Sequence, residues 1–210
     1  MGNRAVITTK ENMYNNGVAI YLHWNGGRDS VEAFLEYGKL KGLHMDDYGF
    51  ARLTQIISNF FGGTLSIGVN VFNHTDYDNM DNGTYIVDND LNIIERRFAP
   101  MFEQNTYDRI DMLLEIDSKQ PQNERFGKDF LTSELVKANE LKIGDTVFLA
   151  RYNEPPKPYT VIGYGRNRYV NGLHTNGIPY TNMYNSMIPE DNVNNYVARH
   201  LDDLVRVKRA

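Results

Sequence analysis

The chain has 210 residues, with 22 basic and 27 acidic side chains and a formal net charge of −5. Hydrophobic residues make up 41% and charged residues 23%, which are ordinary globular values and exclude wholesale disorder. The longest apolar runs fall far short of the roughly 18 residues that a membrane span needs, so we expect no membrane segment. The absence of cysteine excludes disulfides, thiolate metal sites and a cysteine nucleophile, and it fits a reducing cytoplasm.

Two strands are predicted near the start of the chain, at residues 3–9 and 17–24. Both segments are rich in β-branched or aromatic residues, and an Asn-Asn-Gly turn separates them. A helix is predicted to follow, with Asp29 as its N-cap, Glu32 at the third position of a capping box and Gly42 as its end. Its apolar stripe has helical spacing and consists of Val31, Phe34, Leu35 and Gly38.

The next segments alternate between helical and strand patterns. A second helix is predicted at 47–61, ended by a Gly-Gly pair, and residues 64–72 alternate with the period of a strand. A hairpin is predicted from 84–88 and 92–98, followed by a short helix at 106–116. This order predicts an antiparallel sheet with helices on one face, which is an α+β fold.

The sequence suggests two domains. Residues 1–120 form the predicted α+β domain, and the polar, proline-containing stretch at 118–130 is the best linker candidate. Residues 131–210 read as a mostly-β part that resembles a small SH3-like barrel. Its predicted elements are a helix at 133–139 and strands at 146–152, 159–164, 167–173, 178–184 and 204–208.

The junction between the second strand and the first helix is the most distinctive segment. Helix starts offer backbone amides and a positive dipole to anions, so this is a plausible place for chemistry. A catalytic interpretation uses His23 as general base and Arg28 as anion clamp beside Asp29. Trp24 and Asn25 in the same segment are candidate binding residues. A structural interpretation buries the histidine and tryptophan in the strand and leaves the aspartate as a helix cap.

An acidic loop contains Asp76, Asp78 and Asp81. It does not fit an EF-hand, because Met80 falls at position 3, which needs an oxygen ligand, and Asn89 falls where the bidentate Glu should be. We therefore favour an ordinary Asp/Asn/Gly loop and keep a non-standard divalent-ion site as the alternative. The sequence contains no phosphate loop, dinucleotide fingerprint or paired-histidine metal motif, so we expect no cofactor.

The C-terminal part combines many tyrosines with arginines and asparagines. Such residues serve adaptable protein interfaces, and tyrosine and arginine also stack on unpaired bases. The alternative is that about half of these tyrosines fill the core of a small barrel. The candidate binding residues here are Tyr152, Tyr164, Arg166, Arg168 and Tyr169.

Several segments together resemble a known family. They are GNRAVIT at 2–8, IYLHWNGGRDSVEAFL at 20–35, and shorter matches at 50–53, 59–62 and 81–85. The family consists of uncharacterised proteins carried by bacterial phages and plasmids, and the similarity covers roughly the first 100 residues. The resemblance implies an accessory role for a mobile element. Such proteins are often counter-defence factors, including inhibitors of RNA-guided DNA nucleases (anti-CRISPR proteins).

Three functional hypotheses follow. The first is a counter-defence inhibitor in the cytoplasm that binds a host RNA-guided nuclease or its guide RNA. The second is a nuclease or other phosphodiesterase that acts on RNA, with a site around His23, Arg28 and Asp29. The third is a non-catalytic adaptor without nucleic-acid contact. The sequence leaves the oligomeric state open.

Overall fold

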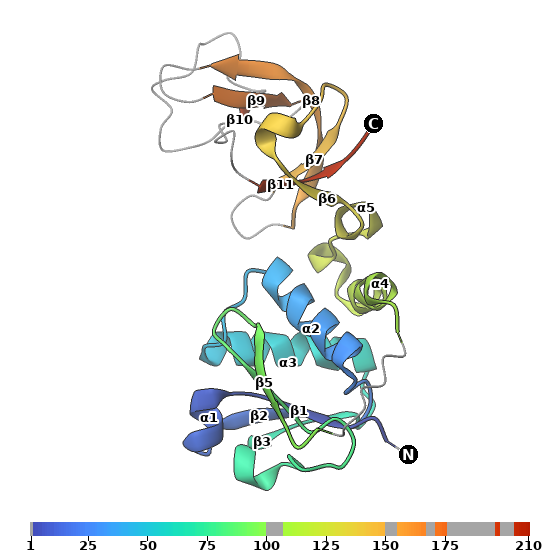
Figure 1. The fold of residues 1–210 in the computed structure, drawn as a ribbon. Coiled ribbons are helices and arrows are strands. Elements are labelled where there is room, and N and C mark those ends of the chain that lie inside the picture. Colours follow the sequence, from blue (N-terminus) through green and yellow to red (C-terminus); the bar gives the residue numbers. More distant parts are fainter. Residues whose placement is uncertain (1, 100–106, 150–154, 167–170, 176–195, 198–203) are drawn as a thin grey trace. The chain divides into compact units, whose positions relative to one another are not determined.

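The computed structural model confirms the α+β class and divides the chain into two compact units, residues 1–125 and 126–210 (Figure 1). The division falls within the stretch 118–130. None of the helices in the described part has the length and hydropathy that a membrane crossing requires. The structure describes the whole chain except residues 1, 100–106, 150–154, 167–170, 176–195 and 198–203.

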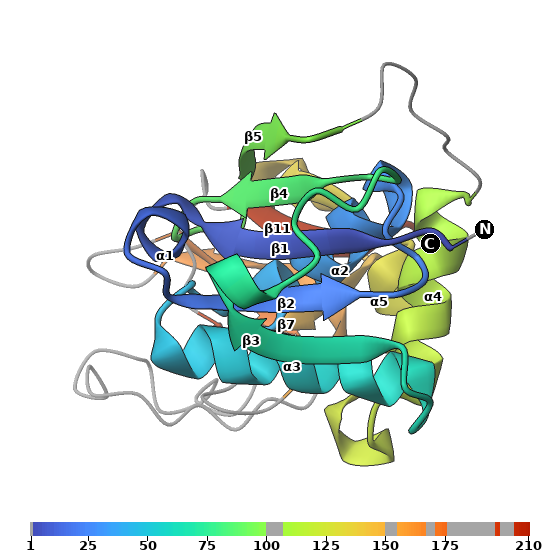
Figure 2. The same ribbon diagram turned by 90° about the horizontal axis from the view of Figure 1, so that it is seen from below.

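The first unit is built on a five-stranded sheet with the order β3-β2-β1-β4-β5 (Figure 2). Its strands are β1 (Ala5–Thr9), β2 (Val18–Leu22), β3 (Ile67–Val71), β4 (Thr84–Val87) and β5 (Ile93–Arg97). Neighbours are antiparallel except β1 and β4, which run parallel with Val6 opposite Thr84. The sheet is therefore mixed, because the chain returns from β3 past β2 and β1 before it enters β4.

The helices of the first unit match their predicted positions to different degrees. They are α1 (Lys10–Tyr14), α2 (Arg28–Leu40), α3 (Asp47–Phe61) and α4 (Arg109–Lys119), with a 3₁₀ turn η1 (Phe72–His74). The predicted bounds of α3 are confirmed: Asp46 caps its start through Gly49 N–H, and Gly62 ends it in the left-handed conformation with φ 65°. The short α1, capped by Thr9, was not predicted.

Both faces of the sheet are covered. Figure 1 shows α2 and α3 against one face, and the predicted stripe of α2 is buried. A smaller cluster covers the other face, where Met13 of α1 and Phe72 of η1 pack with Val6, Ala19 and Ile86. The central strand β1 is consequently buried on both sides, which explains its continuous apolar run rather than an alternating one.

The strand β3 departs from a half-buried pattern. Its β-branched residues alternate with glycine and asparagine as predicted, but Leu65 just before the strand and Val69 within it are exposed. The reason is position, because β3 is an edge strand of the sheet within the described residues. A central strand has neighbouring strands on both sides, whereas β3 has a described neighbour only on the β2 side.

The second unit contains a six-stranded antiparallel sheet with the order β10-β9-β8-β7-β11-β6. Its strands are β6 (Glu134–Lys137), β7 (Thr146–Leu149), β8 (Lys157–Arg166), β9 (Asn171–Thr175), β10 (Tyr196–Val197) and β11 (Leu204–Lys208). The helix predicted at 133–139 is wrong: this segment is β6, which pairs with β11. The described strands do not close into a ring, an SH3-like barrel stays a prediction, and the strand predicted at 178–184 lies outside the described residues.

Short helical turns flank the boundary between the units. They are η2 (Gln122–Glu124), α5 (Lys128–Leu131) and η3 (Ala138–Glu140). The stretch proposed as a linker is thus held by contacts, since Gln120 is buried and donates to the carbonyl groups of Ile56 and Ile116. Arg125 in turn donates to the carbonyl of Gln120 at 2.7 Å.

A buried polar contact joins α2 to α4. The hydroxyl of Tyr37 donates to the Asp117 carboxylate at 2.8 Å, and both side chains are buried. Burial, and then the hydrogen bond to Asp117, raises the pKa of Tyr37 far above its ordinary value of 10.0. The folded protein therefore holds Tyr37 protonated under conditions in which the unfolded chain ionises it.

This contact predicts a pH dependence of stability. Above pH 10 the unfolded tyrosine loses its proton while folded Tyr37 keeps it, so stability is lost as the pH rises. We expect wild type to lose about 1 kcal/mol more of its unfolding free energy between pH 10 and 11 than the Tyr37→Phe variant. Urea unfolding at both pH values measures this difference, and equal losses would show that Tyr37 ionises normally in the folded state.

Candidate functional site

His23 lies just beyond the end of β2. Its backbone N–H donates to Ser66 at 2.8 Å, and its ring Nδ1 is 3.1 Å from the Tyr21 hydroxyl. Its ring packs edge-on against Trp24 at 5.2 Å between centroids. Trp24 itself is 45% exposed, so the interpretation that buries it is wrong. Within the described residues, no hydrogen bond joins His23 to either of the other two candidate catalytic residues.

The Asn-Gly-Gly turn after Trp24 serves close packing. Asn25 has φ 54°, and the next residue, Gly26, donates its N–H to the Asn3 carbonyl at 2.7 Å. The Gly26 carbonyl accepts from the Tyr85 hydroxyl at 3.1 Å. A Cβ at Gly26 would lie 2.6 Å from the Asn3 oxygen, so only glycine fits there. The close approach that the sequence suggested is to the protein's own backbone.

Asp29 is a structural anchor rather than the helix cap. The helix α2 starts at Arg28 with Gly27 as N-cap, so the predicted cap is wrong by two positions. The buried Asp29 carboxylate accepts N–H bonds from Ser30 at 2.8 Å and from Tyr107 at 2.7 Å. The second bond ties the start of α2 to the segment that leads into α4.

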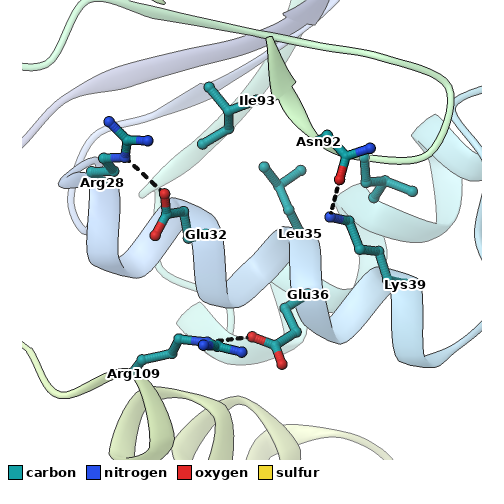
Figure 3. A pocket seen from close by; sticks show the side chains of 9 residues that line it. Arg28, Glu32, Leu35, Glu36, Lys39, Asn92, Ile93 and Arg109 are labelled. Carbon is teal, nitrogen blue, oxygen red and sulfur yellow. Dashed lines mark hydrogen bonds and ion pairs between the residues drawn. The ribbon is translucent and has the colours of Figure 1, made fainter. Parts of the chain in front are cut away.

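Arg28 lines a groove of about 460 Å³ along α2 (Figure 3). We call this the α2 groove. It lies between α2, the start of β5 with the turn before it, and the start of α4. Its lining residues are Arg28, Glu32, Leu35, Glu36, Lys39, Leu91, Asn92, Ile93 and Arg109.

The charges of the α2 groove are held in pairs. The Arg28 Nε lies 2.7 Å from Glu32 Oε1, and the Arg109 Nε lies 2.5 Å from Glu36 Oε2. The hydrogen bond to Glu36 raises the pKa of Arg109, although partial burial opposes this shift. At the far end, the Lys39 ammonium donates to the Asn92 side chain at 2.6 Å. Figure 3 shows these pairs spread along the groove.

This arrangement suits a polar partner with a small apolar contact. Three cations and two carboxylates give the groove an excess of one positive charge. Of its three apolar lining residues, Leu35 and Leu91 are buried, so the partly buried Ile93 supplies the small apolar contact. A phosphate backbone would meet Glu32 and Glu36 as well as the cations, which disfavours a run of phosphates. A protein segment with charges of both signs can match the pairs more closely.

Sequence reasoning found Arg28 but missed the rest of the groove. The spacing of Arg28, Glu32, Glu36 and Lys39 places them on one polar helix face, and that signal was available. Asn92 and Arg109 come from distant segments, and nothing local in the sequence pairs them with α2.

The acidic loop is held by Arg4 and by hydrogen bonds among its own residues. Arg4 binds Asp81 at 2.7 Å and Asp76 at 2.9 Å, so a guanidinium supplies the positive charge there. Burial acts to raise the pKa of Asp81, but hydrogen bonds from the Arg4 side chain and backbone outweigh it and lower that pKa. The buried Asn79 amide accepts N–H bonds from residues 81, 82 and 83. Among the described residues, no three His, Asp or Glu side chains gather as a metal-binding cluster.

The C-terminal candidates are only partly placed. Tyr152, Arg168 and Tyr169 lie outside the described residues. Tyr164 and Arg166 belong to β8, where their backbones pair with Leu173 and Asn171 of β9. A binding surface in this unit stays a prediction.

Comparison with known proteins gives no identification. No protein-family model matches the chain, and neither a curated protein nor a solved structure is significantly similar to it. The resemblance to phage- and plasmid-borne proteins therefore rests on the sequence segments alone. The function has to be argued from the geometry of the site.

The environment of Asp29 predicts a large stability effect. Asp29→Ala leaves two N–H groups without their acceptor, so we expect the unfolding free energy to fall by about 1–3 kcal/mol. The control Glu32→Ala removes one exposed ion pair and is expected to cost less than about 0.5 kcal/mol. Urea denaturation compares the two variants. If Asp29→Ala proves as stable as Glu32→Ala, the anchoring role is wrong.

Proposed function

We propose that the chain is a binding protein that uses the α2 groove to engage a macromolecular partner. We further propose that it is a mobile-element counter-defence factor whose partner is a host RNA-guided nuclease complex. The groove, with its paired charges, is the observation that carries the first statement. The family resemblance of the N-terminal segments supports the second.

The hydrogen bonds of the candidate catalytic residues favour binding over catalysis. A general base must lie within hydrogen-bond reach of the proton that it takes, and an oriented one is held by a third group. The Tyr21 hydroxyl can hold the His23 ring, but among the described residues no hydrogen bond links that ring to Asp29, whose carboxylate accepts two backbone N–H groups. Asp29 therefore has a structural role and does not orient the candidate base.

The protein component of the nuclease complex is favoured over its guide RNA. Glu32 and Glu36 lie among the cations of the groove, and carboxylates repel phosphates. An adaptor without nucleic-acid contact shares this surface chemistry, and the two differ only in the partner. The RNA-degrading alternative depends on His23, and it therefore makes a separate prediction.

The groove hypothesis is tested by inhibition of target-DNA cleavage by a panel of purified RNA-guided nucleases. The double variant Arg28→Ala/Arg109→Ala removes two rim charges, and we expect inhibition of the susceptible nuclease to weaken roughly tenfold. The matched control is Arg52→Ala, an exposed arginine on α3 whose side chain donates to Gln55. If the double variant inhibits as strongly as wild type, the binding surface lies elsewhere. If wild type inhibits none of the nucleases, the proposed partner is wrong.

The catalytic alternative is tested by incubating labelled guide RNA with the protein. We expect the RNA to stay intact with wild type and with His23→Gln, with and without a divalent metal ion. Gel electrophoresis reads the result. Fragments produced by wild type but not by His23→Gln would overturn the binding proposal and establish an RNA-cleaving enzyme.

A further inference from the structure

The two edges of the sheet in the first unit differ in how they are protected. At β5, a register shift interrupts the pairing with β4, and Glu95 and Arg97 form an ion pair at 2.5 Å. Arg96 is also engaged, since it donates to the Asn82 carbonyl. Bulges and charged side chains are the devices by which proteins keep sheet edges from pairing with other chains. The β5 edge is therefore protected.

The β3 edge carries none of these devices. Its five residues pair with β2 in unbroken register and include no charged residue or proline. The 20 residues from Ile56 to Thr75 contain no Asp, Glu, Lys or Arg, in a chain with 23% charged residues. A strand that approaches β3 therefore meets no charge on β3 itself or on the segments that flank it in sequence.

The side chains of β3 are complementary to those of a second β3. Ile67, Val69 and Val71 share one face of the strand, and Gly68 and Asn70 share the other. An antiparallel pairing centred on Val69 places Ile67 opposite Val71 and Gly68 opposite Asn70. β-branched side chains then meet each other across the pair, an arrangement that stabilises sheets. Val69 is 53% exposed and available for this contact, and Leu65 just before the strand is exposed as well.

We propose that two copies of the chain associate through their β3 strands in a two-fold antiparallel pairing. The two sheets then become one continuous sheet, and outward N–H and C=O groups of both edges gain partners. The Val71 N–H exchanges its bond to the Asn70 side-chain oxygen, at 2.9 Å, for one across the pair. A second copy is the occupant that this edge fits, because it offers a neutral strand of equal length with the same β-branched face. The proposal does not depend on the α2 groove, which lies beside β5 at the opposite edge of the sheet.

The test is the concentration dependence of mass in sedimentation equilibrium of the full chain. Val69→Lys places a charge on β3, and Ile94→Lys is its matched control, because Ile94 is also 53% exposed but lies in β5. We expect wild type and Ile94→Lys to dimerise equally and Val69→Lys to dimerise at least tenfold more weakly. Asn70→Lys, on the other face of the same strand, should show the same weakening, and circular dichroism checks that each variant is folded.

Two results would overturn the proposal. The first is a wild type that stays monomeric at all concentrations, which would leave the β3 edge to a different partner or to none. The second is a dimer that neither Val69→Lys nor Asn70→Lys weakens, which would place the interface on another surface.

Discussion

Burial of β1 on both faces is the constraint on which the first unit depends. The helices α2 and α3 cover one side of the sheet, and α1 with η1 covers the other, so β1 has to lie in the middle. A central strand needs a partner on each edge, and β4 supplies the second by running parallel to it. The start of α2 is then fixed against this centre, because Gly26 packs on Asn3 and accepts the Tyr85 hydroxyl.

The proposed binding surface follows from this placement. With the start of α2 pressed on β1 and its apolar stripe buried, the opposite helix face looks outward with its charges in pairs. The turn before β5 and the start of α4 provide the two walls, and Asp29 holds the second wall in place through Tyr107. Asp29 therefore positions the groove without lining it. Of the candidate catalytic residues, Asp29 thus supports the groove, whereas Arg28 lines it.

The sequence predicted those elements whose bounds depend on residues close together in the chain. The bounds of α3 follow from its periodicity and the Gly62-Gly63 stop, and the stripe of α2 follows from its spacing. The parallel pair and the strand at Glu134–Lys137 depend on partners far along the chain, and β6 pairs with β11 some 70 residues away. The same division holds in the groove, where Arg28 was predicted and Arg109 was not. Contacts between distant segments leave no short-range pattern to recognise.

The central claim is that a partner occupies the α2 groove, and carboxyl footprinting tests it most directly. The Glu32 side chain is accessible to a carbodiimide label in the free protein, and Asp47 at the start of α3 is an exposed reference. With a susceptible nuclease complex bound, the account predicts that labelling of Glu32 falls several-fold while labelling of Asp47 is unchanged. Unchanged labelling of Glu32 in a complex that has formed would contradict the account.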